Sequence, residues 1–483
     1  MLRIPNASLV TRCTLAIFVS VIATLSTTLI HAAPRQATAG TPPATNVILF
    51  IGDGMDEHQI TMARNYLYDS EGMFSMEKMP VRSSVRVKTL REDNPDHFRY
   101  VADSANTAST LATGFFTSKG RISTSAHGDV DQKTILEDAQ AQRYRTGLVT
   151  TSSLTDATPA AFATHAAHRY CQSASAMHFA NSALDKTQQC ARDLKKNGGP
   201  GSIAEQLAAA DIDVLLGGGT DLFNQRLEVD ESNHSTILDK ALSHGYQFLS
   251  TKEESQTAHS KTRLLGLFAR THLPVEWQGE HHRRAELIKT DNQGKAIFPR
   301  PFSCEKNPDH RDTPELAEMT SRAIQALSQN NDNGFFLMVE GASIDKQAHE
   351  RNPCGQIGEI QAFDKAVSVG RQFAAQQTNT LIIVTADHGH AGQVVPLPES
   401  YQASSNALKI ESYPTGYYAV LKTLSGELMA VNYATNSSPH SQWETHTGIN
   451  VPVFMEGPGL EHIPVLTDQR AINQLMRRHL KLH

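Results

Sequence analysis

Residues 381–389 read LIIVTADHG, an apolar run rich in β-branched side chains that ends directly in an acidic residue and a histidine. Two other segments repeat this pattern: residues 46–55 read NVILFIGDGM, and residues 335–345 read FFLMVEGASID. Short, continuous apolar runs of this kind are typical of parallel strands that are buried on both faces. The sequence therefore predicts an α/β fold with a central, mostly parallel sheet flanked by helices.

The acidic residues that end these runs are Asp53, Glu340 and Asp387. In open α/β sheets, ligands bind beyond the carboxyl ends of the strands. Carboxylates that gather at one such edge repel each other unless a cation lies between them. We therefore predict a site for more than one metal ion, although Asp53 by itself could be an ordinary turn residue after a buried strand.

Histidines in the same region offer nitrogen ligands. His388 directly follows Asp387, and a buried pair of this kind needs polar partners. Asp345 and His349 are four residues apart, so on a helix they share one face, either as metal ligands or as a surface pair. His446 stands alone in a predicted loop, where a structural role is the simpler interpretation.

Ser104 begins an alanine-rich stretch that predicts a helix. It is either a helix cap or a nucleophile at the N-terminus, where free N–H groups stabilise a phosphoryl group. No Gly-x-Ser-x-Gly motif surrounds it, so a metal ion would have to activate the hydroxyl. Arg169 has a planar guanidinium group whose paired N–H donors match two phosphate oxygens, although an ordinary exposed arginine is the simpler interpretation.

Composition indicates a globular protein without a nucleic-acid partner. The 483 residues are 39% hydrophobic and 19% charged, with a net charge of −6, and no Lys/Arg run would follow a phosphate backbone. We predict one domain over residues 46–483 with a polar insertion at about 221–310. Helices are predicted over 313–327, capped by Thr313, and over 359–375, and a last strand over 451–454.

The N-terminal segment has the pattern of a secretory signal. Arg3 and Arg12 precede an apolar stretch from Cys13 to Ile30, and small residues follow. We predict a signal peptide over residues 1–33, with cleavage between 32 and 39, and a linker over 34–45. The protein would then be periplasmic or secreted, with no stable membrane span; an uncleaved anchor is the alternative.

Four cysteines remain beyond that signal, an even number that indicates two disulfides in an exported protein. Four cysteines allow three pairings, of which Cys171–Cys190 and Cys304–Cys354 close the shortest loops. A zinc–thiolate site is the alternative, but the chain has no Cys-x-x-Cys pair.

Together these segments resemble the alkaline phosphatase family over most of the chain after the signal. The motifs are IGDGM at 51–55, DSA at 103–105, DATPAA at 156–161, EGASIDK at 340–346, TADH at 385–388 and HTG at 446–448. The resemblance implies a homodimer, the disulfide pairing given above, and hydrolysis of small phosphate monoesters to inorganic phosphate and an alcohol through a phosphoserine.

The resemblance also implies two Zn²⁺ and one Mg²⁺ per subunit. The ligands would be Asp345, His349 and His446 for one zinc, Asp53, Asp387 and His388 for the other, and Asp53, Thr158 and Glu340 for magnesium. Imidazole mixed with carboxylate suits zinc, whereas oxygen ligands suit magnesium. Ser104 would be the nucleophile and Arg169 the phosphate clamp.

Asp156 and Lys346 match two positions at which family members vary. This pairing resembles a bacterial subgroup in which the two residues hold magnesium-bound waters, so we expect a strict magnesium preference and modest turnover. We also expect an alkaline pH optimum, because a serine alkoxide is favoured at high pH.

The main alternative is a phosphodiesterase or nucleotide pyrophosphatase of the same superfamily. Such enzymes typically use a threonine nucleophile and lack the third-metal residues and the arginine, so Thr158, Glu340 and Arg169 argue against it. A sulfatase would need a Cys/Ser-x-Pro-x-Arg motif, which Ser104 does not begin. A non-catalytic metal-binding or phosphate-binding protein is a further alternative, but such a protein would not require the nucleophilic serine that the motifs include.

Overall fold

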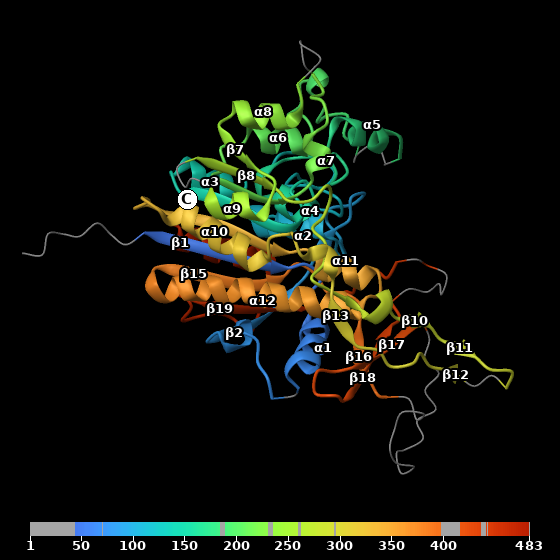
Figure 1. Ribbon diagram of the computed structural model, residues 1–483. Coiled ribbons are helices and arrows are strands. Elements are labelled where there is room, and N and C mark those ends of the chain that lie inside the picture. Colours follow the sequence, from blue (N-terminus) through green and yellow to red (C-terminus); the bar gives the residue numbers. More distant parts are fainter. Residues whose placement is uncertain are drawn as a thin grey trace, which may run out of the picture. The chain divides into compact units, whose positions relative to one another are not determined.

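A single large sheet forms the centre of the fold. Within the described part of the chain its ten strands are, in spatial order, β20 (Leu466–Asp468), β2 (Val81–Arg86), β19 (Val451–Glu456), β15 (Thr380–Ala386), β1 (Thr45–Gly52), β14 (Gly334–Gly341), β5 (Arg145–Ser153), β6 (Val214–Gly218), β8 (Arg263–Leu267) and β7 (Tyr246–Leu249) (Figure 1). All neighbouring pairs are parallel except those that β19 makes with β15 and β2. The predicted α/β class with a mostly parallel sheet is confirmed.

The computed structural model describes residues 44–69, 71–183, 189–229, 235–258, 262–293, 296–397, 416–435, 441 and 443–482. The predicted signal peptide, residues 1–33, and residues 34–43 of the predicted linker lie outside the described residues. None of the helices that are described is long and apolar enough to cross a membrane.

Helices cover both faces of the sheet. Those packed with one another on one face are α1 (Glu57–Tyr68), α10 (Leu316–Ser328), α11 (Ser343–His349) and α12 (Pro353–Gln376). Those on the other are α2 (Ser104–Thr113), α3 (Ile135–Ala141), α4 (Ala157–Ala163) and α13 (Gln469–His479). The remaining helices are α5 (Ala174–Ala183), α6 (Ile203–Ala209), α7 (Thr220–Phe223), α8 (Ile237–Ser243) and α9 (Lys252–Thr257), with short 3₁₀ turns η1 (Met76–Lys78), η3 (Lys195–Asn197), η4 (Glu280–His282) and η5 (Pro308–His310).

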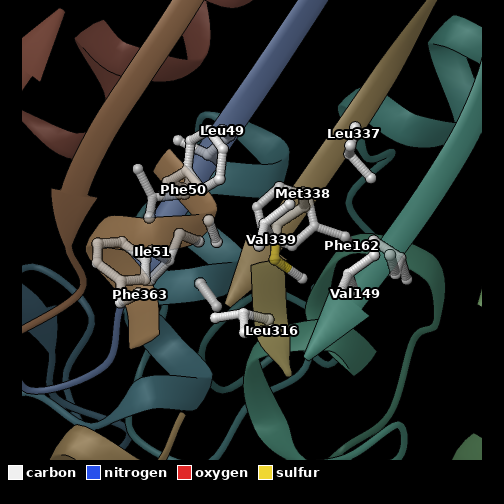
Figure 2. Packing of buried hydrophobic residues seen from close by; sticks show 14 of the residues in the cluster. Leu49, Phe50, Ile51, Val149, Phe162, Leu316, Leu337, Met338, Val339 and Phe363 are labelled. Carbon is white, nitrogen blue, oxygen red and sulfur yellow. The ribbon is translucent and has the colours of Figure 1, made fainter. Parts of the chain in front are cut away.

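Consecutive side chains of β14 show why the central strands are apolar throughout. Phe335 packs against Phe373 of α12, whereas Phe336 stacks on Phe162 of α4. Successive residues of a strand point to opposite faces, so a strand covered on both sides buries every side chain. Figure 2 shows this core around β1 and β14, where Phe50 meets Phe363 of α12 edge to face.

Smaller sheets lie outside the central one. A four-stranded sheet has the order β10 (Glu286–Leu287), β17 (Tyr417–Lys422), β18 (Leu428–Tyr433) and β16 (Gln393–Val395). Three two-stranded pairs are β3 (Thr89–Leu90) with β4 (Phe98–Arg99), β13 (Cys304–Lys306) with β9 (Trp277–Gly279), and β11 (Lys289–Thr290) with β12 (Ala296–Ile297). Of the region predicted as an insertion, 221–310, strands β7 and β8 belong to the central sheet; the domain boundaries themselves stay a prediction.

Three local predictions are wrong in detail. Thr313 does not cap α10; the helix begins at Leu316 and Glu315 is its cap, because the Glu315 amide donates to the Glu318 side chain in a capping box. Helix α12 begins at Pro353 rather than at residue 359, because Asn352 caps it and proline fits the first turn. The strand at 451–454 is not the last, since β20 follows it.

The predicted disulfide pairing is confirmed. Cys171 is bonded to Cys190 and Cys304 to Cys354. The Cys171–Cys190 bond closes the segment that follows α4, and the Cys304–Cys354 bond joins β13 to the first turn of α12.

A buried carboxyl group on α12 makes stability depend on pH. Glu359 is 3% exposed and accepts a hydrogen bond from the Glu276 amide at 3.0 Å. Burial, and secondarily the charge of Glu276, raise the pKa of Glu359 from 4.5 to about 8. Its contribution to stability is fully present below pH 4.5 and is lost as the pH rises to about 8, because the unfolded chain then releases the proton more readily.

We predict that Glu359→Gln removes this loss, since the amide oxygen can still accept the Glu276 hydrogen bond. Between pH 4.5 and pH 8, wild type should lose about 2–5 kcal/mol more of its unfolding free energy than the variant does. Denaturant unfolding at both pH values measures it. Substitution of the exposed Glu461 by Gln is the control, and parallel pH curves for wild type and Glu359→Gln would contradict the prediction.

Candidate active site

Strand register brings the predicted acidic residues to one edge of the sheet. Gly52 of β1 is aligned with Gly341 of β14 and with Ala386 of β15. Asp53 and Asp387 therefore follow aligned positions on neighbouring strands, and Glu340 lies one residue before the end of the third. The carboxyl ends of three central strands thus meet, as the sequence pattern predicts.

The turn after β1 requires glycine. Gly54 has φ +68°, and a Cβ atom there would lie 3.1 Å from both Cα and Cβ of Asp345. Its amide donates to Asp387 Oδ1 at 3.0 Å. This turn therefore ties the end of β1 to Asp387 and allows α11 to approach closely.

A first cluster of side chains that could hold a metal ion surrounds Asp345. His349 Nε2 lies 3.4 Å from Asp345 Oδ2, and the Nε2 atoms of His390 and His446 each lie 3.3 Å from Asp345 Oδ1. His446 thus joins the cluster rather than standing alone in its loop. His390 is the residue that the sequence analysis missed; its position two residues after His388, in the motif Asp-His-Gly-His, is the local signal for it.

A second cluster adjoins the first. His388 Nε2 lies 3.4 Å from Asp53 Oδ1 and 3.3 Å from Asp387 Oδ2, and all three residues are buried. The imidazole of His388 stacks on that of His446 with ring centroids 3.7 Å apart. The two predicted zinc-ligand sets are therefore neighbours, each gathered as the sequence analysis expects.

Several polar atoms of this region lie close together but lack a hydrogen-bond partner. Asp345 Oδ1, His390 Nε2 and Thr158 Oγ1 are buried and make no hydrogen bond of good geometry. Buried polar atoms ordinarily have a hydrogen-bond partner or a bound ion. Imidazole and carboxylate atoms left in this way fit divalent cations, with Thr158 and Glu340 supplying oxygen atoms for a further ion.

The electrostatics point the same way. Burial, reinforced by Asp387 and Asp345, raises the pKa of Asp53 well above its usual value. Burial likewise raises the pKa of Asp387 to about 6 and that of Glu340 to about 7. These carboxylates repel one another in a desolvated space, so cations between them would favour their charged form.

Ser104 is the first residue of α2, and its neighbour Asp103 caps the helix by accepting from the Asn106 amide. Ser104 Oγ lies 3.2 Å from His388 Nε2 and 3.4 Å from Asp53 Oδ1. The simpler interpretation of Ser104 as the cap is therefore wrong. The N-terminus of α2 instead directs its hydroxyl at the second cluster.

Arg169 is held by acidic residues at the same cavity. Its guanidinium donates to Asp156 Oδ1 at 3.0 Å and lies 3.5 Å from Asp103 Oδ2. Lys346 Nζ donates to the other Asp156 oxygen at 2.7 Å. Burial opposes the charges, but Lys346 and Arg169 hold the pKa of Asp156 below its usual range, so both cations face a carboxylate.

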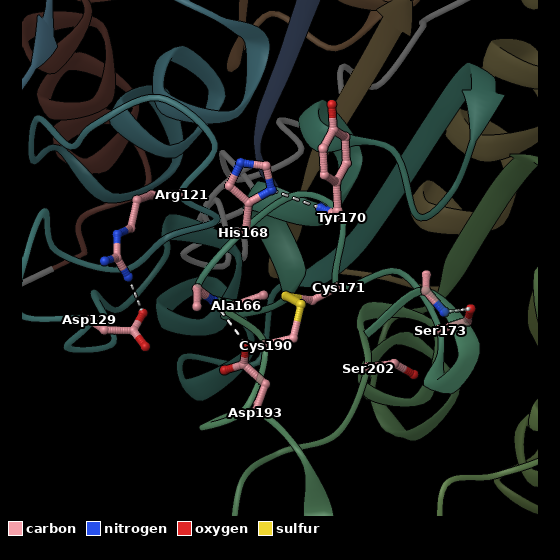
Figure 3. The surroundings of a disulfide bond; sticks show 12 residues. Arg121, Asp129, Ala166, His168, Tyr170, Cys171, Ser173, Cys190, Asp193 and Ser202 are labelled. Atoms are coloured by element: carbon pink, nitrogen blue, oxygen red, sulfur yellow. Dashed lines mark hydrogen bonds and ion pairs between the residues drawn. A yellow bond between two sulfur atoms is a disulfide. The ribbon is translucent and has the colours of Figure 1, made fainter. Parts of the chain in front are cut away.

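A cavity of about 990 Å³ opens over these groups. The predicted site residues that line it are Ser104, Asp156, Arg169, Asp345, Lys346, His349 and His446. The other predicted ligands, Asp53, Thr158, Glu340, Asp387 and His388, are buried and do not line it. Figure 3 shows the Cys171–Cys190 disulfide beside the segment with His168 and Tyr170, on either side of Arg169, so this bond anchors one wall.

Comparison with known proteins agrees with this arrangement. The sequence model of the alkaline phosphatase family matches residues 44–482. Alkaline phosphatase of Escherichia coli (strain K12) is 38% identical over 447 residues, which are 91% of this chain and 87% of that protein. Streptomycin-6-phosphate phosphatase of Streptomyces griseus is 38% identical over 454 residues, covering 91% and 92% of the two chains.

A solved structure of similar fold is alkaline phosphatase from the Antarctic bacterium TAB5, with a TM-score of 0.64, 22% identity, and coverage of 92% of this chain and 100% of that one. The family match, the fold and the clustered carboxylate and imidazole groups together define a metal-dependent α/β hydrolase. The chain belongs to the alkaline phosphatase family, and its reaction is the hydrolysis of phosphate monoesters.

Proposed function

We propose that Ser104 is the nucleophile of this hydrolysis and is transiently phosphorylated. The observation that carries the proposal is the position of Ser104 Oγ, which lies at a helix N-terminus, lines the cavity, and is 3.2 Å from His388 Nε2. Free N–H groups at a helix N-terminus stabilise a phosphoryl group near that hydroxyl. Ser104 Oγ would bond to phosphorus as the alcohol departs, and water would later cleave the phosphoserine.

Two zinc ions and one magnesium ion are the metals that suit this site. Asp345, His349 and His446 would hold one zinc, Asp53, Asp387 and His388 the second, and Asp53, Thr158 and Glu340 the magnesium. When bound, the ions supply Lewis-acid chemistry, which lowers the pKa of hydroxyl groups and neutralises charge on reacting oxygen atoms. The unpartnered Asp345 Oδ1 and Thr158 Oγ1 support these sets.

Arg169 would bind the phosphoryl oxygens. A guanidinium group binds phosphate through two parallel N–H donors, and this requires that its plane be held in place. Asp103 and Asp156 contact it at 3.5 and 3.0 Å and so orient that plane toward the cavity. Asp103 also caps α2, so a single carboxylate links the position of Arg169 to that of the serine.

The test is hydrolysis of p-nitrophenyl phosphate beside bis-p-nitrophenyl phosphate from pH 7 to 10. It is run before and after chelation, with zinc and magnesium added back. We expect monoester turnover that rises with pH, is lost to the chelator, and returns only with both metals. A preference for the diester would favour the phosphodiesterase alternative. Zinc binding without turnover of either ester would favour a binding protein.

Lys346 offers a test of the magnesium preference. The 2.7 Å contact between Lys346 Nζ and Asp156 occupies this carboxylate with an ammonium group that binds no metal. Lys346→His should lower magnesium affinity about 10- to 100-fold, admit zinc, and change kcat, because imidazole suits zinc. Reactivation of metal-free enzyme by each ion measures it.

Lys365→His is the matched control, since Lys365 is also ion-paired, 3.4 Å from Glu276, but does not line the cavity. Unaltered metal preference and rate in Lys346→His would show that the Asp156–Lys346 pair does not set the choice of metal.

We further propose that the protein is exported and forms a homodimer. Two disulfides support export, because such bonds persist in oxidising compartments. The signal pattern of residues 1–33 supports it independently. The dimer rests on the family resemblance, and light scattering of the purified protein would decide it, with a monomer mass as the contrary result.

A further inference from the structure

Trp443 is an exposed aromatic side chain on the wall of the active-site cavity. It lines the 990 Å³ cavity, and 56% of its surface is exposed. Its indole ring meets the His349 ring edge to face, with centroids 6.0 Å apart. Because this ring is exposed on the cavity wall and contacts a residue of the first cluster, it is accessible to a ligand that enters the cavity.

The residue that follows Trp443, Glu444, is hydrogen-bonded to His349 of α11. His349 Nδ1 donates to the Glu444 carbonyl at 2.6 Å, and the Glu444 amide donates back to the His349 carbonyl at 3.0 Å. The Glu444 carboxylate accepts from Arg351 at 2.7 Å, and the Ser441 hydroxyl contacts both the amide and the carbonyl of Trp443. An aromatic ring positioned in advance binds a ligand at a lower entropic cost.

Trp443 lies on the side toward which the alcohol would depart. The hydroxyl of Ser104 contacts His388 and Asp53 of the second cluster. In an in-line displacement the leaving oxygen lies opposite the attacking one, which places the alcohol away from that contact. Trp443 is next to His349, which belongs to the other cluster.

We propose that Trp443 binds the planar leaving group of aromatic phosphate monoesters, that is, of nucleoside and aryl monophosphates. This inference rests on the proposed function and adds a substrate class to it. The face of the indole stacks on a nucleobase or phenyl ring, whereas a sugar or aliphatic alcohol has no aromatic ring and packs on the indole more weakly. Trp443 is thus a specificity-determining residue that touches the alcohol and takes no part in bond breaking.

The test compares adenosine 5′-monophosphate with ribose 5-phosphate, which shares the phosphorylated ribose and carries a hydroxyl group in place of adenine. The measured quantity is the ratio of their kcat/KM values for enzyme loaded with zinc and magnesium. Because kcat/KM covers the steps up to alcohol release, hydrolysis of the shared phosphoenzyme does not affect it. We expect Trp443→Ala to lower the ratio about three- to tenfold and Trp443→Phe to restore most of it.

Tyr170→Ala is the matched control. Tyr170 also lines the cavity and is 49% exposed, but it adjoins Arg169 rather than His349. Its removal should leave the ratio at the wild-type value. An equal fall in Tyr170→Ala and Trp443→Ala would overturn the assignment to Trp443, because any exposed aromatic ring would then serve.

Fluorescence gives a readout that does not depend on turnover. The chain has two tryptophans, and the second, Trp277, packs against Tyr66 and does not line the cavity. Adenosine should quench the emission of the metal-loaded enzyme, ribose should not, and Trp443→Phe should abolish the quenching. If Trp443→Ala leaves the ratio of the two kcat/KM values unaltered and adenosine does not quench the emission, this proposal is overturned. Turnover of ribose 5-phosphate would in that case still support the proposed phosphatase function. If the wild-type enzyme hydrolysed neither substrate, the proposed function itself would be contradicted.

Discussion

Ser104→Ala is expected to lower kcat/KM for phosphate monoesters by about 10³- to 10⁶-fold, because it removes the oxygen atom that we propose bonds to phosphorus. Water could still attack a phosphate held by Arg169, so a small residual rate is expected. Two measurements check this result: steady-state hydrolysis of p-nitrophenyl phosphate, and acid trapping of the phosphoenzyme, which should disappear entirely.

Ser109→Ala is the matched control for this experiment. Ser109 lies on the same helix, is equally buried, and donates to the Arg121 carbonyl at 3.0 Å rather than to the metal clusters. Its replacement should cost about 1 kcal/mol of stability and leave the phosphoenzyme trappable. Wild-type rates in Ser104→Ala would exclude this serine as the nucleophile, and an equal loss in both variants would indicate damage to α2.

Asp345→Asn is expected to have the second-largest effect. Asp345 lies within 3.4 Å of His349 and 3.3 Å of both His390 and His446, and the two histidines on the cavity wall lower its pKa against the effect of burial. An amide lacks the negative charge with which Asp345 would hold a divalent ion. We expect the loss of about one zinc per chain and a fall in kcat/KM of about 10²- to 10⁴-fold, since a bound ion contributes several kcal/mol.

Elemental analysis of the purified protein separates this effect from misfolding. Asp364→Asn is the control. Asp364 is a carboxylate on α12, where it accepts hydrogen bonds from the Ser75 and Met76 amides at 2.8 and 2.9 Å. It should keep its full zinc content. An Asp345→Asn protein with unchanged zinc would rule out the proposed ligand role, whatever its activity.

Much of the fold can be predicted from local signals. The buried strands around Phe50, Val339 and Ile383 are continuous apolar runs, and each ends at a polar turn that the sequence displays directly. Helix boundaries were less accurate: α10 begins after Thr313 and α12 well before residue 359. Capping depends on a few side-chain hydrogen bonds that compete closely, so neighbouring starts differ little in free energy.

The candidate site divides in the same way. Asp53 and Asp387 can be predicted because each directly follows a strand, and His388 because it follows Asp387; parallel strands bring their carboxyl ends together. His446 is predicted only through the family resemblance, because it lies 97 residues from His349 and no local pattern indicates that their Nε2 atoms are 3.1 Å apart. His390 is intermediate: the motif contains it, but only its distance to Asp345 distinguishes a cluster member from a core histidine.

The sequence by itself determined the α/β class, the acidic strand ends and the family resemblance, since these follow from residue type and spacing along the chain. It favoured one of three cysteine pairings, which the structure then confirmed. Only the tertiary structure decided that Asp103 joins the Ser104 helix to Arg169, that His390 faces Asp345, and that Trp443 borders the cavity. The reason is physical: apolar runs and turns are set by near neighbours, whereas these contacts exist only after packing brings distant loops to one edge of the sheet.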